Sequence, residues 1–143
     1  PREVAAGQVF VVRRDTVEKL PVPRASVAAA ISAILENVHK DMFDRAHKDM
    51  KEHTAKVHSC PEFTSSLDGG NVLLAPFCGR EECEDVIKKE SAREEAAEPG
   101  APAMGAKSLC IPFDQPGSVD NLACIHPACK TKPQFYTLFG RSY

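Results

Sequence analysis

The sequence holds 143 residues, of which 43% are hydrophobic and 27% are charged, and its formal net charge is −2. These values describe one ordinary globular domain, or one small domain with part of another, and they argue against a strongly basic nucleic-acid-binding protein. No apolar run is long enough to span a membrane, and residues 1–25 do not resemble a signal peptide.

The sequence contains six cysteines. Without a secretory signal they favour metal ligands or buried thiols over disulfides, because cytosolic thiols stay reduced, and we expect a cytoplasmic protein. The chain opens at Pro1 on what resembles the approach to a strand, which suggests a fragment of a longer protein. Residues 1–60 contain ten Lys/Arg against eight Asp/Glu, so any contact with phosphate is expected in this half.

Residues 8–13 form a β-branched, apolar run that predicts a strand buried on both faces. Pro21 and Pro23 are expected to break regular structure after it. A long helix should begin near Ser26, a residue type that favours the N-cap, because apolar residues then recur at steps of three and four until the pattern fades near Val57. A helix of roughly thirty residues would be about 45 Å long.

The second half of the chain alternates helix and strand patterns and ends on a strand. The predicted helices are residues 61–67 and 81–92, and the predicted strands are residues 72–77, 108–113 and 134–139. Loops are expected at residues 94–106 and 114–123. This order predicts an α/β fold, a small mixed sheet with packed helices.

Two cysteine pairs of equal spacing, Cys78-x4-Cys83 and Cys124-x4-Cys129, give the clearest chemical signal. Four thiolates close the tetrahedral shell of a structural zinc ion and leave no open position for a reacting water. Buried free thiols without a chemical role are the alternative. Because imidazole also suits zinc, His126 could replace Cys124 as the fourth ligand.

The other candidate residues favour structural roles. Cys110 lies in an apolar strand pattern, where core packing is expected, and a nucleophilic role with His126 as base is the alternative. Cys60 precedes a helix and lacks a partner. The glycines of residues 100–108 do not form a phosphate-binding loop, because Ala106 separates the second glycine from the lysine and a strand follows. They are expected to build a tight surface loop.

Polar residues of the predicted helices are read as surface residues. The histidines lack the i, i+4 spacing of a helical metal site and are expected to be exposed; they are His39, His47, His53 and His58. The carboxylates of residues 81–98 are expected to serve as helix-dipole partners and solvating charge. Arg13 and Arg14, at a strand end, are the candidates for contact with nucleic-acid phosphate. No catalytic residue and no ATP site is predicted.

Three segments carry a resemblance to a known family. Pro76-Phe77-Cys78-Gly79, residues 98–113 and residues 136–143 closely resemble the C-terminal extension of prolyl-tRNA synthetases of the eukaryotic and archaeal type. Val12-Arg13-Arg14-Asp15-Thr16-x-Glu18-Lys19 resembles the end of the anticodon-binding domain of the same enzymes. The resemblance implies a boundary between residues 1–56, the end of that domain, and residues 57–143, a zinc-binding domain.

The resemblance implies a class II aminoacyl-tRNA synthetase that activates proline with ATP and transfers it to tRNA(Pro). The catalytic domain, with its ATP and magnesium, would lie N-terminal to these residues. The segment itself would then be non-catalytic and would support stability and domain placement in a cytoplasmic, homodimeric parent enzyme that does not bind membranes. The alternative is a stand-alone, zinc-stabilised interaction module derived from such a tail. A small independent enzyme that uses Cys110 is a third and weaker reading.

The family's zinc ion is held by four cysteines, and Cys78, Cys83 and Cys129 match three of those positions. The family spaces the second pair more tightly, and Pro127 occupies the nearest equivalent place, so Cys124 and His126 both remain candidates for the fourth. Val17 replaces the glycine of a DTGEK motif, so the turn there is expected to be built differently. The family's terminal tyrosine is similar to Tyr143, whose carboxylate would approach the catalytic domain.

Overall fold

The structure is a computed structural model that describes residues 2–92 and 104–141, and it divides into two compact units, Pro1–Lys51 and Glu52–Tyr143. Most of the predicted loop at residues 94–106 lies outside the described residues, and so does Tyr143. Among the residues that the structure describes, no helix is both long and apolar enough to cross a membrane.

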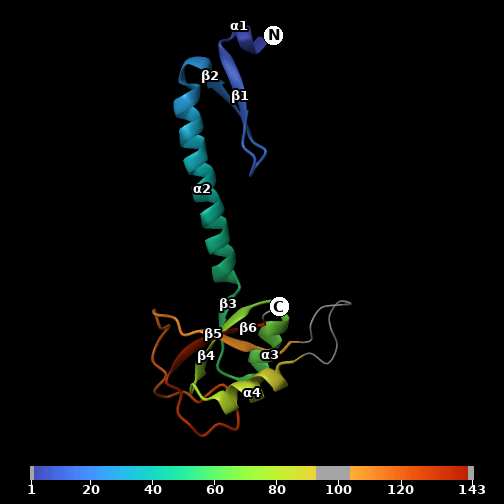
Figure 1. The fold of residues 1–143 in the computed structure, drawn as a ribbon, viewed down its shortest axis with the longest axis vertical. Helices are drawn as coiled ribbons and strands as arrows, with labels where there is room; N and C mark the ends of the chain where they lie inside the picture. Colours follow the sequence, from blue (N-terminus) through green and yellow to red (C-terminus); the bar gives the residue numbers. More distant parts are fainter. Residues whose placement is uncertain (1, 93–103, 142–143) are drawn as a thin grey trace. The chain divides into compact units, whose positions relative to one another are not determined.

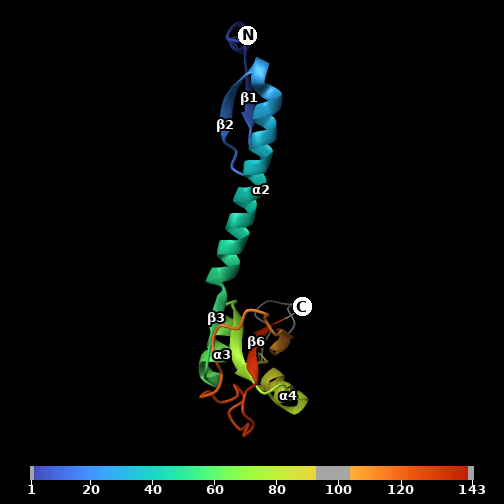
Figure 2. The same cartoon turned by 90° about the vertical axis from the view of Figure 1, so that its left-hand side faces the viewer.

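The first unit contains a two-stranded antiparallel hairpin followed by one long helix, as Figure 2 shows. Its elements are α1 (Arg2–Ala5), β1 (Gln8–Val12), β2 (Lys19–Pro23), a 3-10 turn (Arg24–Ser26) and α2 (Val27–Glu52). The predicted strand and long helix are therefore both present. Burial along β1 alternates, however, and Phe10 and Val12 are 57% and 51% exposed, so the expected burial on both faces is wrong. An apolar run does not reveal how many layers surround it.

Pro21 and Pro23 lie inside β2, where a break was expected. Phe10 pairs with Pro21 and Gln8 with Pro23. The even-numbered residues of this strand direct their backbone N–H and C=O groups toward β1. The Arg24 amide donates to the carbonyl of Gly7 at 2.8 Å, and the carbonyl of Glu18 accepts from the Arg13 amide at 2.9 Å. The two prolines therefore place their missing N–H groups on the unpaired edge of the strand, where proline is tolerated.

The turn between β1 and β2 keeps a glycine-like conformation without a glycine. Val17 has a φ of 60°, in the left-handed region that β-branched residues avoid. Its amide donates to the carbonyl of Arg13 at 2.9 Å, and its side chain is 72% exposed. Val17 therefore holds a conformation that glycine would adopt without strain.

Helix α2 contains 26 residues and is about 39 Å long. Ser26 lies in the preceding 3-10 turn, where its hydroxyl donates to the carbonyl of Pro23 at 3.3 Å. The predicted apolar stripe is present, but no residue of α2 is buried, and Leu35 and Met42 are 62% and 55% exposed. The helix ends at Glu52, before the position where its periodic pattern fades, because the chain turns into a short strand.

The second unit is a four-stranded mixed sheet with helices α3 (Cys60–Asp68) and α4 (Glu81–Glu90) (Figure 1). Its strands are β3 (Thr54–Lys56), β4 (Val72–Phe77), β5 (Lys107–Cys110) and β6 (Phe135–Gly140) in the order β3-β4-β6-β5. Only the β3–β4 pair is parallel among them. The predicted mixed α/β fold is confirmed. Strand β3 was missed because its three residues fall where the helical pattern of α2 continues.

Helices α3 and α4 share one hydrophobic core with the sheet. Phe139 of β6 is fully buried and meets Phe63 of α3 and Phe77 of β4 in edge-to-face contacts, with ring centroids 5.5 and 5.4 Å apart. Ile87 of α4 and Leu73 of β4 belong to the same cluster. Each such buried side chain contributes about 1.5–3 kcal/mol. The core thus fixes the end of β4 against the start of α4.

The strand predicted at residues 108–113 is shorter than expected and lies at the edge of the sheet as β5. β5 ends at Cys110, with an irregular register between Ser108 and Cys110. Cys110 is exposed, so the expected core packing of this thiol is wrong. Glu84 anchors this strand, because its Oε1 accepts from the Ser108 amide at 3.0 Å and from the Ser108 hydroxyl at 2.6 Å. This carboxylate is therefore a structural partner rather than solvating charge.

Gly105 closes the loop onto α4. A Cβ at this position would overlap the carbonyl group of Lys88. Next to it, the buried Ser91 hydroxyl accepts from the Ala106 amide at 2.7 Å and donates to the carbonyl of Ile87 at 2.6 Å. Gly105 is buried and serves close packing on the helix, whereas Gly100 lies outside the described residues.

Candidate metal centre

The first cysteine pair lies at the junction of β4 and α4. Cys78 follows the last residue of β4, and Gly79 turns the chain with a φ of +78°. Cys83 lies in the first turn of α4, where its amide donates to the carbonyl of Arg80 at 3.2 Å. The strand end, the turn and the helix start therefore place both thiols on the same side of the junction.

The second pair comes from the irregular segment before β6. The Ile125 amide donates to the carbonyl of Pro76 at 2.8 Å, and the Gln134 amide donates to the carbonyl of Phe77 at 2.9 Å. These two bonds hold the segment alongside the end of β4. Within the segment, the Cys129 amide donates to the carbonyl of His126 at 3.0 Å. Two cysteine pairs that are distant in sequence thus become neighbours.

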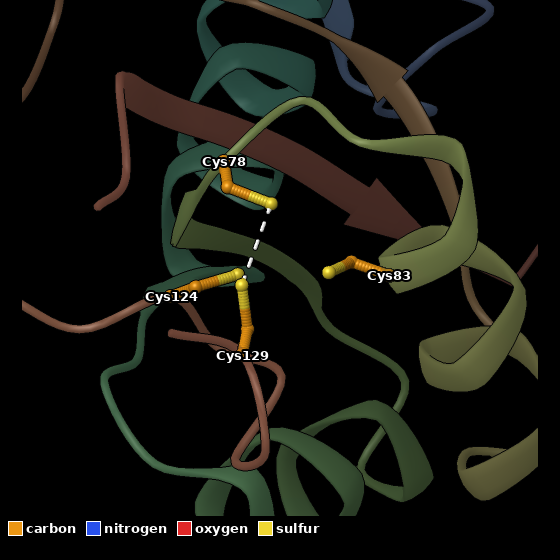
Figure 3. Close-up of side chains that lie close together, drawn as sticks. All are labelled: Cys78, Cys83, Cys124 and Cys129. Atoms are coloured by element: carbon orange, nitrogen blue, oxygen red, sulfur yellow. Dashed lines mark hydrogen bonds between the residues drawn. The ribbon is translucent and has the colours of Figure 1, made fainter. Parts of the chain in front are cut away.

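The four sulfur atoms converge on one point between these segments, as Figure 3 shows. All four lie within 4.8 Å of one another, and the sulfurs of Cys78 and Cys129 are 3.8 Å apart. A tetrahedral zinc ion with Zn–S distances of about 2.3 Å requires sulfur atoms about 3.8 Å apart. The cluster therefore has the size and the donor set of a structural metal site, and zinc is the metal that it suits best.

Burial favours the protonated form of two of these thiols in the absence of a metal. It raises the pKa of Cys83 to about 12 and the pKa of Cys124 to about 11. Cys129 differs: burial would raise its pKa as well, but hydrogen bonds outweigh that effect and lower it to about 7. One of them comes from the Thr131 amide, which donates to the Cys129 sulfur at 3.4 Å.

His126 lies beside the cluster. Its Nδ1 is 3.4 Å from the sulfur of Cys83. The sulfur of Cys124 lies among the four clustered donors. His126 was expected as a possible ligand, and its contact with Cys83 was not predicted. The sequence does not identify the Thr131 amide as a donor to Cys129 either, because a backbone donor does not depend on the residue type.

The remaining cysteines lie outside the cluster. Cys60 begins α3, and its thiol donates to Glu90 Oε2 at 3.9 Å. Cys110 lines an open groove of about 340 Å³ with the aromatic rings of Phe77 and Phe135. The ring of His126 faces Cys83, so the structure does not support a nucleophilic pair of Cys110 and His126. A closed shell of four thiolates holds a metal without offering it to a substrate.

Arg13 and Arg14 have different surroundings. The guanidinium of Arg13 bonds to Asp15 at 2.7 Å and to Asp41 at 2.6 Å, and its side chain is only 10% exposed. The pKa of Asp15 is lowered, chiefly by its hydrogen bonds to Arg13. Arg14 is exposed. Of the two arginines, Arg14 is therefore the one whose side chain the structure leaves accessible to a phosphate.

His39, His47, His53 and His58 are exposed as expected, and His58 makes a cross-sheet contact. His58 precedes α3, and its Nε2 lies 2.9 Å from the hydroxyl of the buried Tyr136. On the same face of the sheet, Lys56 places its ammonium 4.8 Å from the centre of the Tyr136 ring. These two contacts join Tyr136 of β6 to Lys56 of β3 and to His58.

Comparison with known proteins identifies the family of the chain. A family model described as "Prolyl-tRNA synthetase, C-terminal" matches residues 60–143. A bifunctional glutamate/proline–tRNA ligase of Drosophila melanogaster is 56% identical across the whole chain, which covers 8% of that protein. The cytoplasmic proline–tRNA ligase of Arabidopsis thaliana is 32% identical, again across the whole chain, which covers 25% of that protein.

A solved structure extends the likeness to three dimensions. The crystal structure of a prolyl-tRNA synthetase from Cryptosporidium parvum, complexed with halofuginone and AMPPNP, superposes on the whole chain with a TM-score of 0.86 and 31% identity. The chain covers 27% of that structure. It therefore spans a small part, about a quarter or less, of the relatives named here.

Proposed function

The chain belongs to the prolyl-tRNA synthetase C-terminal family, and we propose that it is the non-catalytic C-terminal part of a proline–tRNA ligase. The observation that carries the proposal is the family match over residues 60–143 together with the four-cysteine cluster that the same residues assemble. In this proposal the parent enzyme activates proline with ATP and magnesium in a separate catalytic domain and transfers it to tRNA(Pro). The 143 residues contribute no reacting group.

Within the proposal, Cys78, Cys83, Cys124 and Cys129 hold one zinc ion. The support is the convergence of four sulfurs within 4.8 Å and the burial of three of them. The ion supplies a covalent link between the β4–α4 junction and the segment before β6. Because four thiolates fill the shell, the metal has a structural role, and its binding free energy becomes folding free energy of the second unit.

The proposed domains are the end of an anticodon-binding domain at residues 1–56 and the zinc-binding domain at residues 57–143. The boundary between the two compact units falls between residues 51 and 52, which supports a division in this region of the chain. The first domain would contact tRNA(Pro), with exposed Arg14 as a phosphate partner and Arg13 occupied by two carboxylates. The second would support stability and domain placement in a cytoplasmic, homodimeric enzyme, with Tyr143 directed toward the catalytic domain.

The test uses the longer protein that contains this chain. We expect it to charge tRNA(Pro) with proline in the presence of ATP and magnesium. A Cys78→Ser variant should keep measurable charging at a permissive temperature and lose it on mild heating, because its role is to hold the fold. Absence of proline-dependent charging, or a transcript that encodes no upstream catalytic domain, would favour the stand-alone interaction module instead.

A further inference from the structure

His126 links the two halves of the cysteine cluster through two different groups. Its ring Nδ1 lies 3.4 Å from the sulfur of Cys83, which belongs to the first cysteine pair. Its own carbonyl accepts the Cys129 amide at 3.0 Å, within the second pair. The residue is partly buried beside the cluster rather than exposed as a surface histidine. One side chain therefore connects α4 to the segment before β6 without depending on the metal.

A divalent metal ion held by four thiolates leaves excess negative charge on the cluster sulfurs. Four thiolates around a divalent ion carry a formal net charge of about −2, and charge-assisted hydrogen bonds to sulfur spread that charge. The Thr131 amide already donates to Cys129 at 3.4 Å. Arg80 reaches the hydroxyl of the same threonine at 3.4 Å. Among the described residues around Cys83, the His126 ring is the group positioned to donate to that sulfur.

We propose that His126 is a positioning residue of the metal site, which carries its proton on Nδ1 and donates it in a hydrogen bond to the Cys83 thiolate. The inference rests on the zinc site proposed above and adds a fifth residue to it. A hydrogen bond from a residue outside the ligand set orients the ligand and stabilises its charged form, and loss of such a partner typically weakens metal affinity 10–100-fold. His126 thus acts on the metal through Cys83.

The geometry of the donor gives a sharp test. In asparagine the side-chain nitrogen lies close to the position of histidine Nδ1, whereas in glutamine it lies close to the position of Nε2. His126→Asn should therefore retain the bond to Cys83, and His126→Gln and His126→Ala should lose it. His39→Ala is the matched control, because His39 is an exposed residue of α2 in the other unit.

The experiment measures zinc affinity of the 143-residue chain by competition with a chromophoric chelator, and the visible spectrum of the Co²⁺-loaded protein. We expect His126→Ala and His126→Gln to bind zinc about 10–100-fold more weakly, His126→Asn to bind within a few-fold of wild type, and His39→Ala to be unchanged. The Co²⁺ spectrum should be that of four thiolates in wild type and in His126→Ala alike.

Two results would overturn the inference while leaving the zinc site intact. Unchanged affinity in His126→Ala would show that the contact with Cys83 does not stabilise the bound metal. A Co²⁺ spectrum of three thiolates and one imidazole in wild type, lost in His126→Ala, would make His126 a ligand in place of Cys124. Wild-type chain that binds no metal under reducing conditions would instead defeat the zinc proposal itself, and this inference with it.

Discussion

Gly105 lies so close to the carbonyl of Lys88 that a Cβ at this position would overlap it, and both partners of this contact are backbone. A backbone group in α4 cannot move aside as a flexible side chain can. We expect Gly105→Ala to lower the free energy of unfolding of the second unit by about 1–3 kcal/mol or more, since overpacking of this kind displaces whole elements. Urea unfolding followed by circular dichroism measures the loss.

Gly69→Ala is the control for that substitution. Gly69 has a φ of −73°, and the nearest atom to a Cβ there is the carbonyl oxygen of Ser66 at 3.3 Å. The same methyl group should therefore cost clearly less at residue 69 than at residue 105. Equal losses at both glycines would show that close packing on α4 is not the cause.

Val17 should be replaceable by glycine with a gain in stability. The left-handed conformation costs a non-glycine residue about 1–2 kcal/mol, and the side chain of Val17 is 72% exposed, so it returns little packing energy. Glycine removes the strain but loses more entropy on folding, by about 0.5–1 kcal/mol. Val17→Gly should therefore stabilise the first unit by up to about 1 kcal/mol in thermal unfolding. Thr16→Gly, beside it, should destabilise the unit.

Removal of one cluster thiol should abolish metal binding and unfold the second unit at a much lower temperature. Loss of a structural metal belongs to the mutations that cost more than about 4 kcal/mol. We expect Cys78→Ser to purify without zinc and with a strongly lowered Tm. Cys110→Ser, which makes the same chemical change at an exposed thiol, should keep about one zinc per chain, and Lys107→Ala should change little.

The pKa values of the cluster predict that zinc binding strengthens as pH rises. Cys83 and Cys124, with pKa values of about 12 and 11, hold their protons at pH 7, and zinc must displace both. Each displaced proton should add about one decade of zinc affinity per pH unit while pH stays below these values. Calorimetric titration in buffers of different ionisation enthalpy counts the protons. A count near zero would contradict the raised pKa of these thiols.

The ion pairs of Arg13 predict a different pH response in the first unit. Its bonds to Asp15 lower the pKa of that carboxyl below the usual 3.8. A lowered folded-state pKa contributes stability above the unfolded-state value, and this contribution is lost as pH falls through the folded-state value. Asp15→Asn should therefore lower the melting temperature of the first unit at pH 7, and the difference from wild type should shrink below about pH 4.

Sequence patterns that repeat without interruption predicted their elements well. The run Val72–Phe77 coincides with β4, and the proline near the start and the glycines at the end placed α3 within one residue. The equal spacing of two cysteine pairs predicted which sulfurs converge. These signals are local, so a single sequence contains them.

Other features depend on neighbours that a residue pattern does not identify. Pro21 and Pro23 do not disrupt β2, because their backbone nitrogens lie on the edge of the strand that does not pair with β1. Only the pairing register reveals which edge that is. Cys110 has the pattern of a core thiol but lies in an irregular edge strand. The role of His126 depends on a helix that begins forty-five residues earlier in the chain.

The order of strands in the sheet has a consequence for the timing of folding. Strand β6 lies between β4 and β5, and it also brings Phe139 to the centre of the core. It is the last described strand to leave the ribosome. Until β6 is made, β4 and β5 lack the strand that pairs with both of them, so the second unit completes its core only after residues 135–140 have been synthesised. A nascent chain that stops before residue 135 lacks this strand and is expected to expose its apolar surface to the quality-control proteases of the cell.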